Sequence, residues 1–310
     1  MQIPEVFAIV VTYNGANWIK KCLHSLLTSS IPVNVIIIDN CSTDNTLDII
    51  EKSFNDIFVF KAPYNLGFGA ANNKGIEIAL NKGAQYLFLL NQDAWVEEHT
   101  IEKLLDFSKR NIRYGILSPV HLNSSGTEFD FKFNRYIQSN NIPLQKKDLL
   151  LRNNNTIVFE IPFVNAAAWL IPKITFSLIG EFDSLFFHYG EDVNFCQRVR
   201  YHGLKIGILS NSYIVHDRKD KAMQFNINIF FNRYKSSVFS LLADINKSWF
   251  EVKRIYYREV FINILKIVGC IIIFKFLSLK LYFKKIFFLF SCLGKVKKSR
   301  EKNIRVRYSN

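Results

Sequence analysis

The sequence predicts an α/β protein in which a mostly parallel central sheet has helices on both faces. Three observations lead to this fold class. Short apolar runs rich in β-branched residues alternate with stretches whose apolar residues recur at helical spacing. The apolar runs are continuous, as in strands that are covered on both faces. Finally, the 310 residues are enough for one large domain plus an appendage, and 49% of them are hydrophobic.

Four strand–helix units occupy the first part of the chain. The expected strands are VFAIVVTY (6–13), VNVIIIDN (33–40), IFVFKAP (57–63) and YLFLL (86–90). The expected helices span 16–29, 42–54, 69–83 and 97–110. The second helix opens with capping residues, and the third ends at Gly83. Strands that alternate with helices of this length form parallel sheets, which bind ligands beyond the carboxyl ends of their strands.

The pattern changes after residue 115. We expect strands joined by a turn at 115–133, a polar loop within 146–160, a strand at 161–172, a helix at 190–203 and a strand or strand pair at 205–217. Residues 221–295 show the pattern of long helices. The predicted division is therefore an α/β domain over residues 1–220 and a basic, apolar helical extension over residues 221–310.

Charge separates these two parts of the chain. Residues 1–216 contain 19 Lys and Arg against 20 Asp and Glu, whereas residues 217–310 contain 21 against 6. The segment 260–294 is very apolar, but five lysines interrupt it: Lys266, Lys275, Lys280, Lys284 and Lys285. No charge-free run reaches the roughly 18–20 residues of a spanning helix. We expect helices that lie in the interface of an anionic membrane; packing against the first domain, or against a partner subunit in a homo-oligomer, is the alternative.

Other features bear on compartment and partners. The five cysteines lack metal-ligand or redox spacing, which favours free thiols in a reducing compartment. The N-terminus lacks the basic region and cleavage site of a signal peptide, so we expect a cytoplasmic protein on the inner face of the membrane. The Phe-rich, aliphatic character of the basic segment disfavours nucleic acid as a partner.

Polar side chains follow the first two strands. Thr12, Tyr13 and Asn14 end the first strand, and Asp39 ends the second. The Tyr13 ring could stack on a flat base, and the Asp39 carboxylate could accept the ring N–H of a uracil or thymine. Each residue also has an ordinary explanation, because Asn14-Gly15 is a good turn and Asp39 opens a helix-capping run.

The third and fourth strands end in further polar groups. The loop NLGFGAANN (65–73) differs from a dinucleotide fingerprint, because it follows the third strand and Asn72 replaces the third glycine. Its glycines can still let the backbone approach a phosphate or ribose at a helix N-terminus, and Asn65 and Asn72 could donate neutral hydrogen bonds. Asp93 ends the fourth strand. A lone carboxylate on Mg²⁺ or Mn²⁺ leaves coordination sites for phosphate oxygens and water, so a metal here would imply a diphosphate substrate.

A second polar cluster lies in FFHYGEDVNFCQR (186–198). Glu191 and Asp192 begin a helix, where the dipole stabilises carboxylates, so simple capping is one explanation. The alternative is that one of the two acids is a general base within reach of an acceptor hydroxyl. His216 ends a later apolar strand, as a structural residue or as a metal ligand.

Six stretches together resemble a known family. They are VVTYN, VIIIDNCSTDNT, NLGFGAANNKGI, LLNQDAWV, NAAAWLIP and FFHYGEDVNFCQRVRYHG, and they cover about residues 6–217. In order and spacing the chain resembles family 2 glycosyltransferases of the GT-A fold, especially bacterial rhamnosyltransferase-like members. The resemblance implies an inverting glycosyltransferase of cell-surface polysaccharide synthesis. Its donor would be a nucleotide-sugar, with dTDP-rhamnose preferred and a UDP-hexose as the other choice, and its acceptor a glycan or a lipid-linked glycan.

The resemblance also implies roles for single residues. Those expected to bind the nucleotide part of the donor are Thr12, Tyr13, Asn14, Asp39, Asn65, Gly67, Asn72 and Asn91. Asn91-Gln92-Asp93 corresponds to the metal-binding DXD motif of the family, with Asn91 in place of the first acid. Asp93 and His216 would then bind the divalent cation, Asp192 would be the catalytic base, and Trp169 and Glu191 would contact the acceptor.

Two other functions remain open from the sequence. A nucleotidyltransferase shares this type of sheet but usually has a Gly-rich loop with a basic residue after the first strand, which TYNGANW lacks. A non-catalytic, membrane-associated module that binds sugar nucleotides is the other, because Asn91 removes one acid from the motif.

Overall fold

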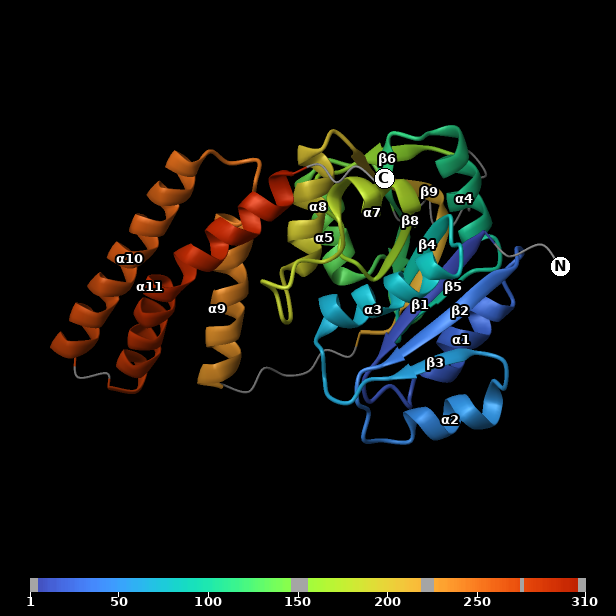
Figure 1. Cartoon of the computed structure of the whole chain (residues 1–310), viewed down its shortest axis with the longest axis horizontal. Coiled ribbons are helices and arrows are strands. Elements are labelled where there is room, and N and C mark those ends of the chain that lie inside the picture. The colour runs from blue at the N-terminus through green and yellow to red at the C-terminus, as the bar shows by residue number, and fades with distance from the viewer. Residues whose placement is uncertain (1–4, 146–155, 219–225, 274–275, 306–310) are drawn as a thin grey trace.

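A computed structural model of the chain describes residues 5–145, 156–218, 226–273 and 276–305. In the described residues one nine-stranded sheet forms the centre of the molecule. Its strands are β1 (Val6–Thr12), β2 (Val33–Asp39), β3 (Phe58–Lys61), β4 (Tyr86–Asn91), β5 (Ala94–Val96), β6 (Tyr114–Leu122), β7 (Val158–Glu160), β8 (Ala168–Pro172) and β9 (Lys205–His216). Their order is β3-β2-β1-β4-β8-β6-β9-β5, with β7 paired to β9 (Figure 1).

The first half of the sheet is parallel, as the sequence predicts. β1 pairs with β2 and β4, and β2 pairs with β3, all in parallel register. The second half is mixed, because β8 runs antiparallel to both β4 and β6, whereas β6 and β9 are parallel. An α/β sheet with helices on both faces is confirmed, although antiparallel pairs take a larger share of it than expected.

Helices cover both faces because each strand of the parallel half alternates its buried side chains. On β1, Phe7 and Ile9 face one core, while Ala8 and Val10 face the other. The helices of the first core are α3 (Phe68–Asn81), α5 (Phe131–Ser139), α7 (Lys173–Ile179) and α8 (Glu191–Tyr201). Those of the second are α1 (Ile19–Leu27), α2 (Thr46–Ser53) and α4 (Thr100–Arg110). Both cores are therefore built around the sheet whose carboxyl edge the sequence marks as the ligand site.

Two of the elements expected after residue 115 need correction. The second strand expected in 115–133 is reduced to one antiparallel bridge between Leu122 and Phe129, because α5 begins at Phe131. Asp130 Oδ1 accepts a hydrogen bond from Phe133 N at 2.9 Å and so caps this helix. The strand expected at 161–172 is limited to β8, and β5, β7 and α7 are additional elements. The polar loop expected within 146–160 lies mostly outside the described residues, and its last three form β7.

Three helices form the C-terminal extension. They are α9 (Ile227–Leu242), α10 (Trp249–Ile272) and α11 (Phe276–Ile304), in agreement with the predicted long helices. They share a third apolar core, to which α10 contributes Val252 and α11 contributes Leu289. Ser248 and Glu251 form a reciprocal capping box at the start of α10. In the described part of the chain, no helix has both the length and the hydropathy needed to cross a bilayer.

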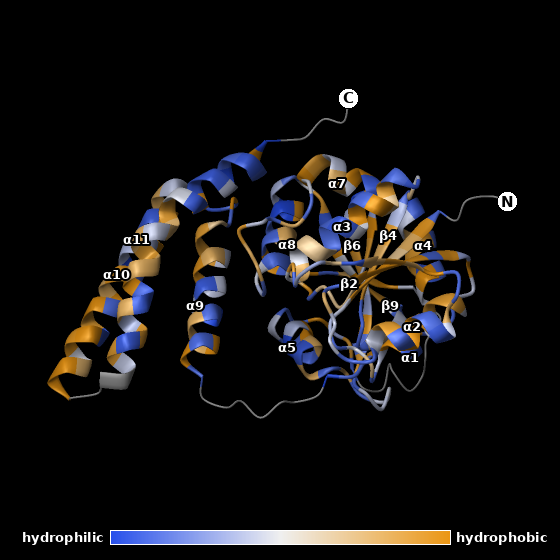
Figure 2. Cartoon of the chain, turned by 60° about the horizontal axis from the view of Figure 1, so that its bottom comes forward, coloured by the Kyte–Doolittle hydropathy of each residue, from blue (hydrophilic) through white to orange (hydrophobic). Residues whose placement is uncertain are grey.

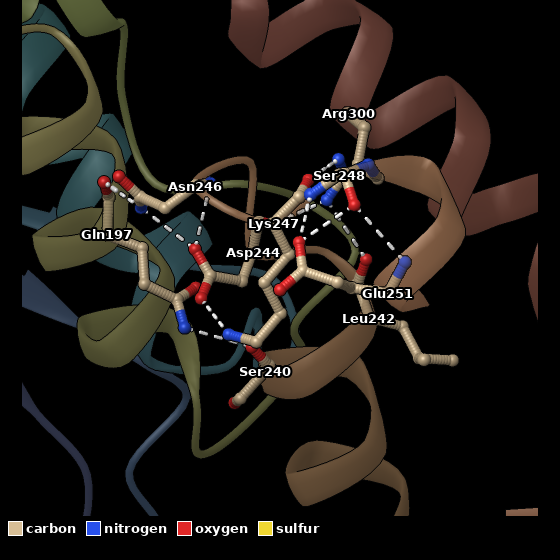
Figure 3. A network of polar contacts seen from close by, with 9 residues as sticks. All are labelled: Gln197, Ser240, Leu242, Asp244, Asn246, Lys247, Ser248, Glu251 and Arg300. Carbon is tan, nitrogen blue, oxygen red and sulfur yellow. Dashed lines mark hydrogen bonds and ion pairs between the residues drawn. The ribbon is translucent and has the colours of Figure 1, made fainter. Parts of the chain in front are cut away.

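Polar contacts fasten the extension to the α/β part. Figure 3 shows Gln197 of α8 donating to the Ser240 carbonyl of α9, while Asn246 donates to the Gln197 carbonyl, both at 2.9 Å. In the same network the buried guanidinium of Arg300, on α11, donates to the Lys247 carbonyl at 2.5 Å. These bonds join α8 to α9 and to the loop after α9, and Arg300 joins α11 to the same loop. The extension therefore contacts the helix that begins with Glu191 and Asp192.

Candidate functional site

The polar strand ends meet at the carboxyl edge of the parallel half-sheet. Thr12 is the register partner of Asp39, and Val11 is the partner of Asn91. The side chains that end β1, β2 and β4 therefore lie next to one another, as the sequence predicts for parallel strands. The ligand site of this fold is expected at this edge.

Gln92 joins the ends of β1 and β4. The Thr12 hydroxyl donates to Gln92 Oε1 at 2.6 Å, and Tyr13 N donates to the same oxygen at 2.9 Å. Gln92 Nε2 donates back to the Tyr13 carbonyl at 3.1 Å. A Cβ atom on Gly15 would lie 2.2 Å from Gln92 Oε1, so the contact requires glycine there. The Tyr13 ring stays exposed, where a base could stack on it. The sequence includes Gln92 in the Asn91-Gln92-Asp93 motif but gives its side chain no role, because its two partners are about 80 residues away.

Asn14 and Asp39 shape the turn beside these strands. Asn14 adopts φ 50°, and its side-chain oxygen accepts from Thr43 N at 2.8 Å. Asp39 Oδ2 accepts from Ser42 N at 3.1 Å. Asp39 Oδ1 is buried and has no hydrogen-bond partner among the described residues. A buried carboxylate oxygen without a partner costs free energy, so this atom is positioned to accept a hydrogen bond from a ligand N–H.

The 65–73 loop is held by its own asparagines. Asn65 Oδ1 accepts from Gly67 N at 2.9 Å and from the side-chain amide of Asn40 at 3.1 Å. Asn72 is buried, and its Nδ2 donates to the Phe68 carbonyl at 2.9 Å, one turn earlier in α3. The structure thus gives Asn65 and Asn72 roles in shaping the loop, and direct contact with the donor stays a prediction for both.

Asp93 and His216 are adjacent. β5 pairs antiparallel with β9 so that Ala94 is the register partner of His216. Asp93 Oδ1 lies 3.3 Å from His216 Nε2, and the side chains are 28% and 1% exposed. Burial raises the pKa of Asp93, but the hydrogen bond with His216 and the nearby charge of Arg218 outweigh it, so the pKa is lowered overall. Asp93 is therefore stable as a carboxylate at this position.

Arg218 and Asp130 lie behind this pair, and the sequence did not single them out. Arg218 Nε lies 3.2 Å from His216 Nδ1 and 3.2 Å from Asp130 Oδ2. The His121 ring contacts His216 edge-on at 6.2 Å between centroids. The tertiary fold brings Asp130 and His121 to His216 and Arg218, which are only two residues apart in the run HDR after the last strand.

The residues around Asp93 could supply some of the ligands of a divalent cation, but not a full set. Asp93 offers a carboxylate oxygen and His216 an imidazole, and no group of three or more His, Cys, Asp or Glu side chains that could bind a metal exists among the described residues. Because His216 Nδ1 accepts from Arg218, the ring hydrogen lies on Nε2 and points to Asp93. Metal-bound histidines usually donate from their second nitrogen instead. A cation bound at Asp93 would need most of its ligands from phosphate and water.

Glu191 and Asp192 lie at the start of α8, close to the same edge. The backbone N–H of Ala166 donates to Asp192, while the neighbouring Ala167 carbonyl accepts from Asn91 N at 2.9 Å. A two-residue segment therefore connects the Asp192 carboxylate to the end of β4. Glu191 packs against Gly69, in the first turn of α3 and within the 65–73 loop, which we call the donor-side loop. The structure thus brings both carboxylates next to the strand ends.

Burial raises the pKa of both carboxyl groups. The pKa of Glu191 rises to about 7, because the side chain is desolvated and lies beside the charge of Asp192. Glu191 Oε2 has no hydrogen-bond partner among the described residues. Burial also raises the pKa of Asp192, against hydrogen bonds from the Val193 and Ala166 amides. A carboxylate with a raised pKa is a stronger base, which suits proton abstraction.

Trp169 lies in the core and not on the open edge. The side chain is fully buried, and its ring packs against Phe182 and Phe195 at centroid distances of 6.3 and 5.8 Å. Its Nε1 has no hydrogen-bond partner among the described residues. An acceptor would reach this ring only after core side chains move, so the expected acceptor contact of Trp169 stays a prediction.

Residues 7–170 match the family model described as glycosyl transferase family 2, which is more than half of the chain. The chain belongs to glycosyl transferase family 2. This result confirms the resemblance drawn from the six motifs. The model ends before Glu191, so the roles of Glu191, Asp192 and His216 do not follow from it.

Three curated relatives of this family 2 member have names that refer to glycan synthesis or to sugar transfer. A Bacillus subtilis protein named for teichuronic acid biosynthesis is 34% identical over 132 residues, which are 41% of this chain and 51% of that protein. The chain thus spans about half the length of this relative. A dTDP-rhamnosyl transferase of Shigella flexneri is 26% identical over 232 residues, covering 73% of each chain. An N-acetylglucosaminyl-diphospho-decaprenol L-rhamnosyltransferase of Mycobacterium tuberculosis is 24% identical over 263 residues, covering 78% and 85%.

Solved structures confirm the GT-A fold of this family 2 chain. Staphylococcus aureus TarS in complex with UDP has a TM-score of 0.55 at 18% identity, covering 79% of this chain and 66% of TarS 1–349. GalNAc-T7 with UDP, GalNAc and Mn²⁺ has a TM-score of 0.61 at 16% identity, covering 84% and 51%. At these identities the likeness concerns the fold alone.

Proposed function

We propose that this family 2 chain is an inverting glycosyltransferase that moves a sugar from a nucleotide-diphosphate donor to a hydroxyl group. The acceptor is a glycan or a lipid-linked glycan in cell-surface polysaccharide synthesis. The observation that carries the proposal is the meeting of two groups at one sheet edge: the unpartnered carboxylate oxygen of Asp39, and Asp192 at the start of α8. The first suits a nucleotide base, and the second suits an acceptor hydroxyl.

The proposed reaction is a single displacement. Asp192 takes the proton from the acceptor hydroxyl while the hydroxyl oxygen attacks the anomeric carbon. The bond from that carbon to the diphosphate breaks on the opposite side, so the configuration inverts. Asp39 binds the base through its N–H, and the exposed Tyr13 ring stacks on the base. Asn14, Asn65, Gly67, Asn72 and Asn91 line the rest of the nucleotide site in this proposal, and Glu191 and Trp169 lie on the acceptor side.

Asp93, with His216, is the proposed binding site for Mg²⁺ or Mn²⁺. Such a cation would neutralise charge that develops on the leaving diphosphate. The role of this chain is to hold the Asp93 carboxylate deprotonated at the end of β4. The GalNAc-T7 structure was solved with Mn²⁺, which supports a divalent cation for this fold.

The preferred donor is dTDP-rhamnose. Two of the curated relatives are named as rhamnosyltransferases, and one of these names includes a diphospho-decaprenol acceptor. A UDP-hexose is the competing donor, because the Asp39 carboxylate would accept the ring N–H of uracil and thymine equally well. Both bases therefore belong in any test.

A donor screen tests the enzyme class and the donor together. The full chain is incubated with dTDP-rhamnose, UDP-glucose, UDP-galactose and UDP-N-acetylglucosamine, each with Mg²⁺ and with Mn²⁺, and release of nucleoside diphosphate is measured. We expect release from one donor well above that from the others, with dTDP-rhamnose first. Release of pyrophosphate from a nucleoside triphosphate would instead identify a nucleotidyltransferase. Donor binding without release, with or without glycan acceptors, would identify a non-catalytic binding module.

We further propose that the extension binds an anionic membrane surface at the inner face of the cytoplasmic membrane. Exposed apolar side chains lie along the second half of α10 and the first half of α11, on Phe261, Leu265, Ile271, Ile272, Phe283 and Phe287. Figure 2 shows this hydrophobic end of α10 pointing away from the sheet. The excess of Lys and Arg in residues 217–310 complements anionic lipid.

Liposome co-sedimentation tests the membrane proposal. The double variant Ile272→Ser/Phe287→Ser removes two side chains that are 68% and 71% exposed. We expect it to lose most binding to phosphatidylglycerol-containing vesicles, because burying one such side chain contributes roughly 1.5–3 kcal/mol. Ile112→Ser, at an exposed residue of the α/β part, is the control and should bind as the wild type does. Unchanged vesicle binding together with loss of a dimer in sedimentation analysis would instead assign this surface to a homo-oligomer.

A further inference from the structure

Two exposed aromatic residues precede Glu191 and Asp192 by a few positions in the chain. The loop of residues 180–190 joins α7 to α8, and α8 then begins with Glu191. Phe187 and Tyr189 in this loop are 66% and 55% exposed. The proposed function gives no role to either of them, although Tyr189 is only three residues before Asp192.

The start of this loop is fixed by buried polar contacts. The guanidinium of Arg198 donates to the carbonyls of Ile179 and Glu181, both at 2.7 Å. Asp183 accepts from Ser299 Oγ at 2.6 Å and from Asn303 Nδ2 at 2.5 Å. The last two donors belong to α11, so the extension helps to set where the loop begins.

The end of the loop is fixed as well. Ser236 of α9 donates to the His188 carbonyl at 3.0 Å. The Phe187 carbonyl lies so close to the donor-side loop that a Cβ atom on Gly67 would be 2.1 Å from its oxygen. The backbone next to Tyr189 is therefore held on one side by the extension and on the other by the proposed nucleotide site. These contacts fix the position from which the Tyr189 side chain projects.

Tyr189 has a backbone conformation that its side chain disfavours. Its φ is 68°, in the left-handed region, and bulky residues with a Cβ atom rarely adopt it. The other described non-glycine residues with positive φ are Asn14, Cys41 and Asn141. A ring that is more than half exposed recovers little of this cost by burial. Strain of this kind persists mainly where function requires it.

We propose that Tyr189 is the residue on which the acceptor sugar stacks. The ring face of an aromatic side chain is electron-rich and binds the polarised C–H groups on one face of a pyranose ring. Stacking on Tyr189 would place a hydroxyl of that pyranose next to Asp192. The proposal rests on the proposed function, because it assumes that Asp192 deprotonates an acceptor hydroxyl.

Phe187 is the less suitable of the two aromatic residues for this role. Its ring carbon Cδ2 would lie 3.2 Å from a Cβ atom on Gly67, so the Phe187 ring rests on the donor-side loop. Tyr189 follows on the opposite side of His188, whose ring it contacts at 4.0 Å between centroids. The Phe187 ring is therefore taken up by the donor-side loop, whereas the Tyr189 ring contacts His188 and comes two residues before α8 in the chain.

Three variants at Tyr189 separate stacking from structure. Tyr189→Phe keeps the ring, Tyr189→Ala removes it, and Tyr189→Gly removes both the ring and the backbone strain. Phe58→Ala, at an exposed aromatic residue on β3, is the control. Para-nitrophenyl pyranosides of glucose, galactose, rhamnose and N-acetylglucosamine serve as acceptor probes. Nucleoside diphosphate release gives KM for acceptor and donor, and saturation-transfer NMR gives pyranoside binding directly.

We expect Tyr189→Ala and Tyr189→Gly to raise the acceptor KM about tenfold with the donor KM unchanged, as for loss of one aromatic contact. Tyr189→Phe should stay within about twofold of the wild type. Tyr189→Gly should also raise Tm by about 2–4 °C over Tyr189→Ala, because glycine accepts this φ. An unchanged acceptor KM in Tyr189→Ala would overturn the proposal, as would a wild type that shows saturation transfer to none of the pyranosides. A wild type that binds a pyranoside but turns over no donor would contradict the proposed function instead.

Discussion

The α/β part and the helical extension use similarly apolar sequence in opposite ways. On β1 and β2, apolar side chains face two cores and polar groups are left only at the carboxyl edge, where Thr12 and Asp39 meet. On α10 and α11, one face forms the third core, while Ile272 and Phe287 on these helices are mostly exposed. Positive and negative charges nearly balance in residues 1–216, whereas residues 217–310 are strongly basic.

The two parts therefore suit different tasks. A sheet with both faces covered can offer a ligand only its edge, so the polar residues there define a small site. A helical layer with one open face offers a broad surface of apolar and basic groups instead. One contact between the two parts is at Asp183, which accepts hydrogen bonds from Ser299 and Asn303 of α11. We call this contact the joint. Variants can test whether the polar site at the sheet edge, the exposed face of the extension and the joint work independently of one another.

The largest expected effect belongs to Asp192. Asp192→Asn should lower the rate of sugar transfer by roughly 10²–10⁴-fold, the usual contribution of a general base. Binding of the donor and of liposomes should stay the same, because the nucleotide site and the extension are intact. Turnover by release of nucleoside diphosphate and binding by calorimetry measure the two quantities.

Asp106→Asn, at an exposed aspartate of α4, is the matched control for that variant and should keep full activity. If Asp192→Asn keeps wild-type turnover, Asp192 is not the base and Glu191 becomes the residue to test. If it loses liposome binding instead, site and extension are not separable.

Glu191 should make the stability of the α/β part depend on pH. Its pKa of about 7 lies above the ordinary value of 4.5, so ionisation opposes folding. Stability from this group is fully present below pH 4.5 and is lost as pH rises to about 7, by about 3 kcal/mol at most. Glu191→Gln does not ionise, so it should unfold several degrees above the wild type at pH 8 and close to it at pH 5.

The measurement is the Tm of the wild type and of Glu191→Gln between pH 5 and pH 8. Glu97→Gln is a suitable control, because this glutamate lies between β5 and α4, outside the site. Parallel Tm curves for wild type and Glu191→Gln would show that the Glu191 carboxyl is solvated in solution.

Asp183→Ala should weaken the joint between the two parts. It leaves the Ser299 hydroxyl and the Asn303 amide buried without their acceptor, at a cost of about 1–3 kcal/mol. Burial raises the pKa of Asp183 but the hydrogen bonds from Ser299, the Leu185 amide and Asn303 outweigh it, so the pKa is lowered. The stabilisation is therefore present above the ordinary pKa of 3.8 and lost as pH falls through the lowered value.

Calorimetric unfolding at neutral pH measures the joint. Ser299→Ala removes one donor and leaves the carboxylate its other partners, so it should cost less than Asp183→Ala. Equal stability of wild type and Asp183→Ala would mean that the extension docks on the α/β part without this contact.

Much of the fold was predictable because its signals are local. Buried parallel strands give continuous apolar runs, and the helix at 190–203 begins and ends with residues that favour those positions. The failures have local causes too. Phe129, Phe131 and Phe133 alternate with polar residues as in a strand, yet Asp130 caps a helix in which Phe133 and Ile137 are buried one turn apart. The strand β5 is too short to give any periodic signal.

The sequence predicted which residues belong to the candidate site, but it did not predict which of their side chains contact one another. Asp39 and Asp93 were expected at strand ends because they follow apolar runs. The contacts of Gln92 with Thr12, and of Arg218 with His216, join residues through the tertiary fold or through side-chain orientation. The register that sets Asp93 beside His216 depends on the pairing of β5 with β9, about 120 residues apart. No periodicity reports such a pairing.

The smallest expected effect concerns Arg218 and separates two ways of controlling the Asp93 site. Arg218→Gln removes a positive charge beside His216 and should strengthen Mn²⁺ binding roughly tenfold, measured by electron paramagnetic resonance without nucleotide. Arg218→Lys keeps the charge but cannot reproduce the planar Nε–H contact with the ring. If Arg218→Lys also strengthens Mn²⁺ binding, the hydrogen bond from Arg218 to His216 Nδ1 is what keeps the imidazole from binding the cation. If Arg218→Lys binds Mn²⁺ as the wild type does, the positive charge of residue 218 is what weakens binding. Unchanged affinity in both variants, with loss of Mn²⁺ binding in Asp93→Ala, would show that Asp93 binds the cation without His216.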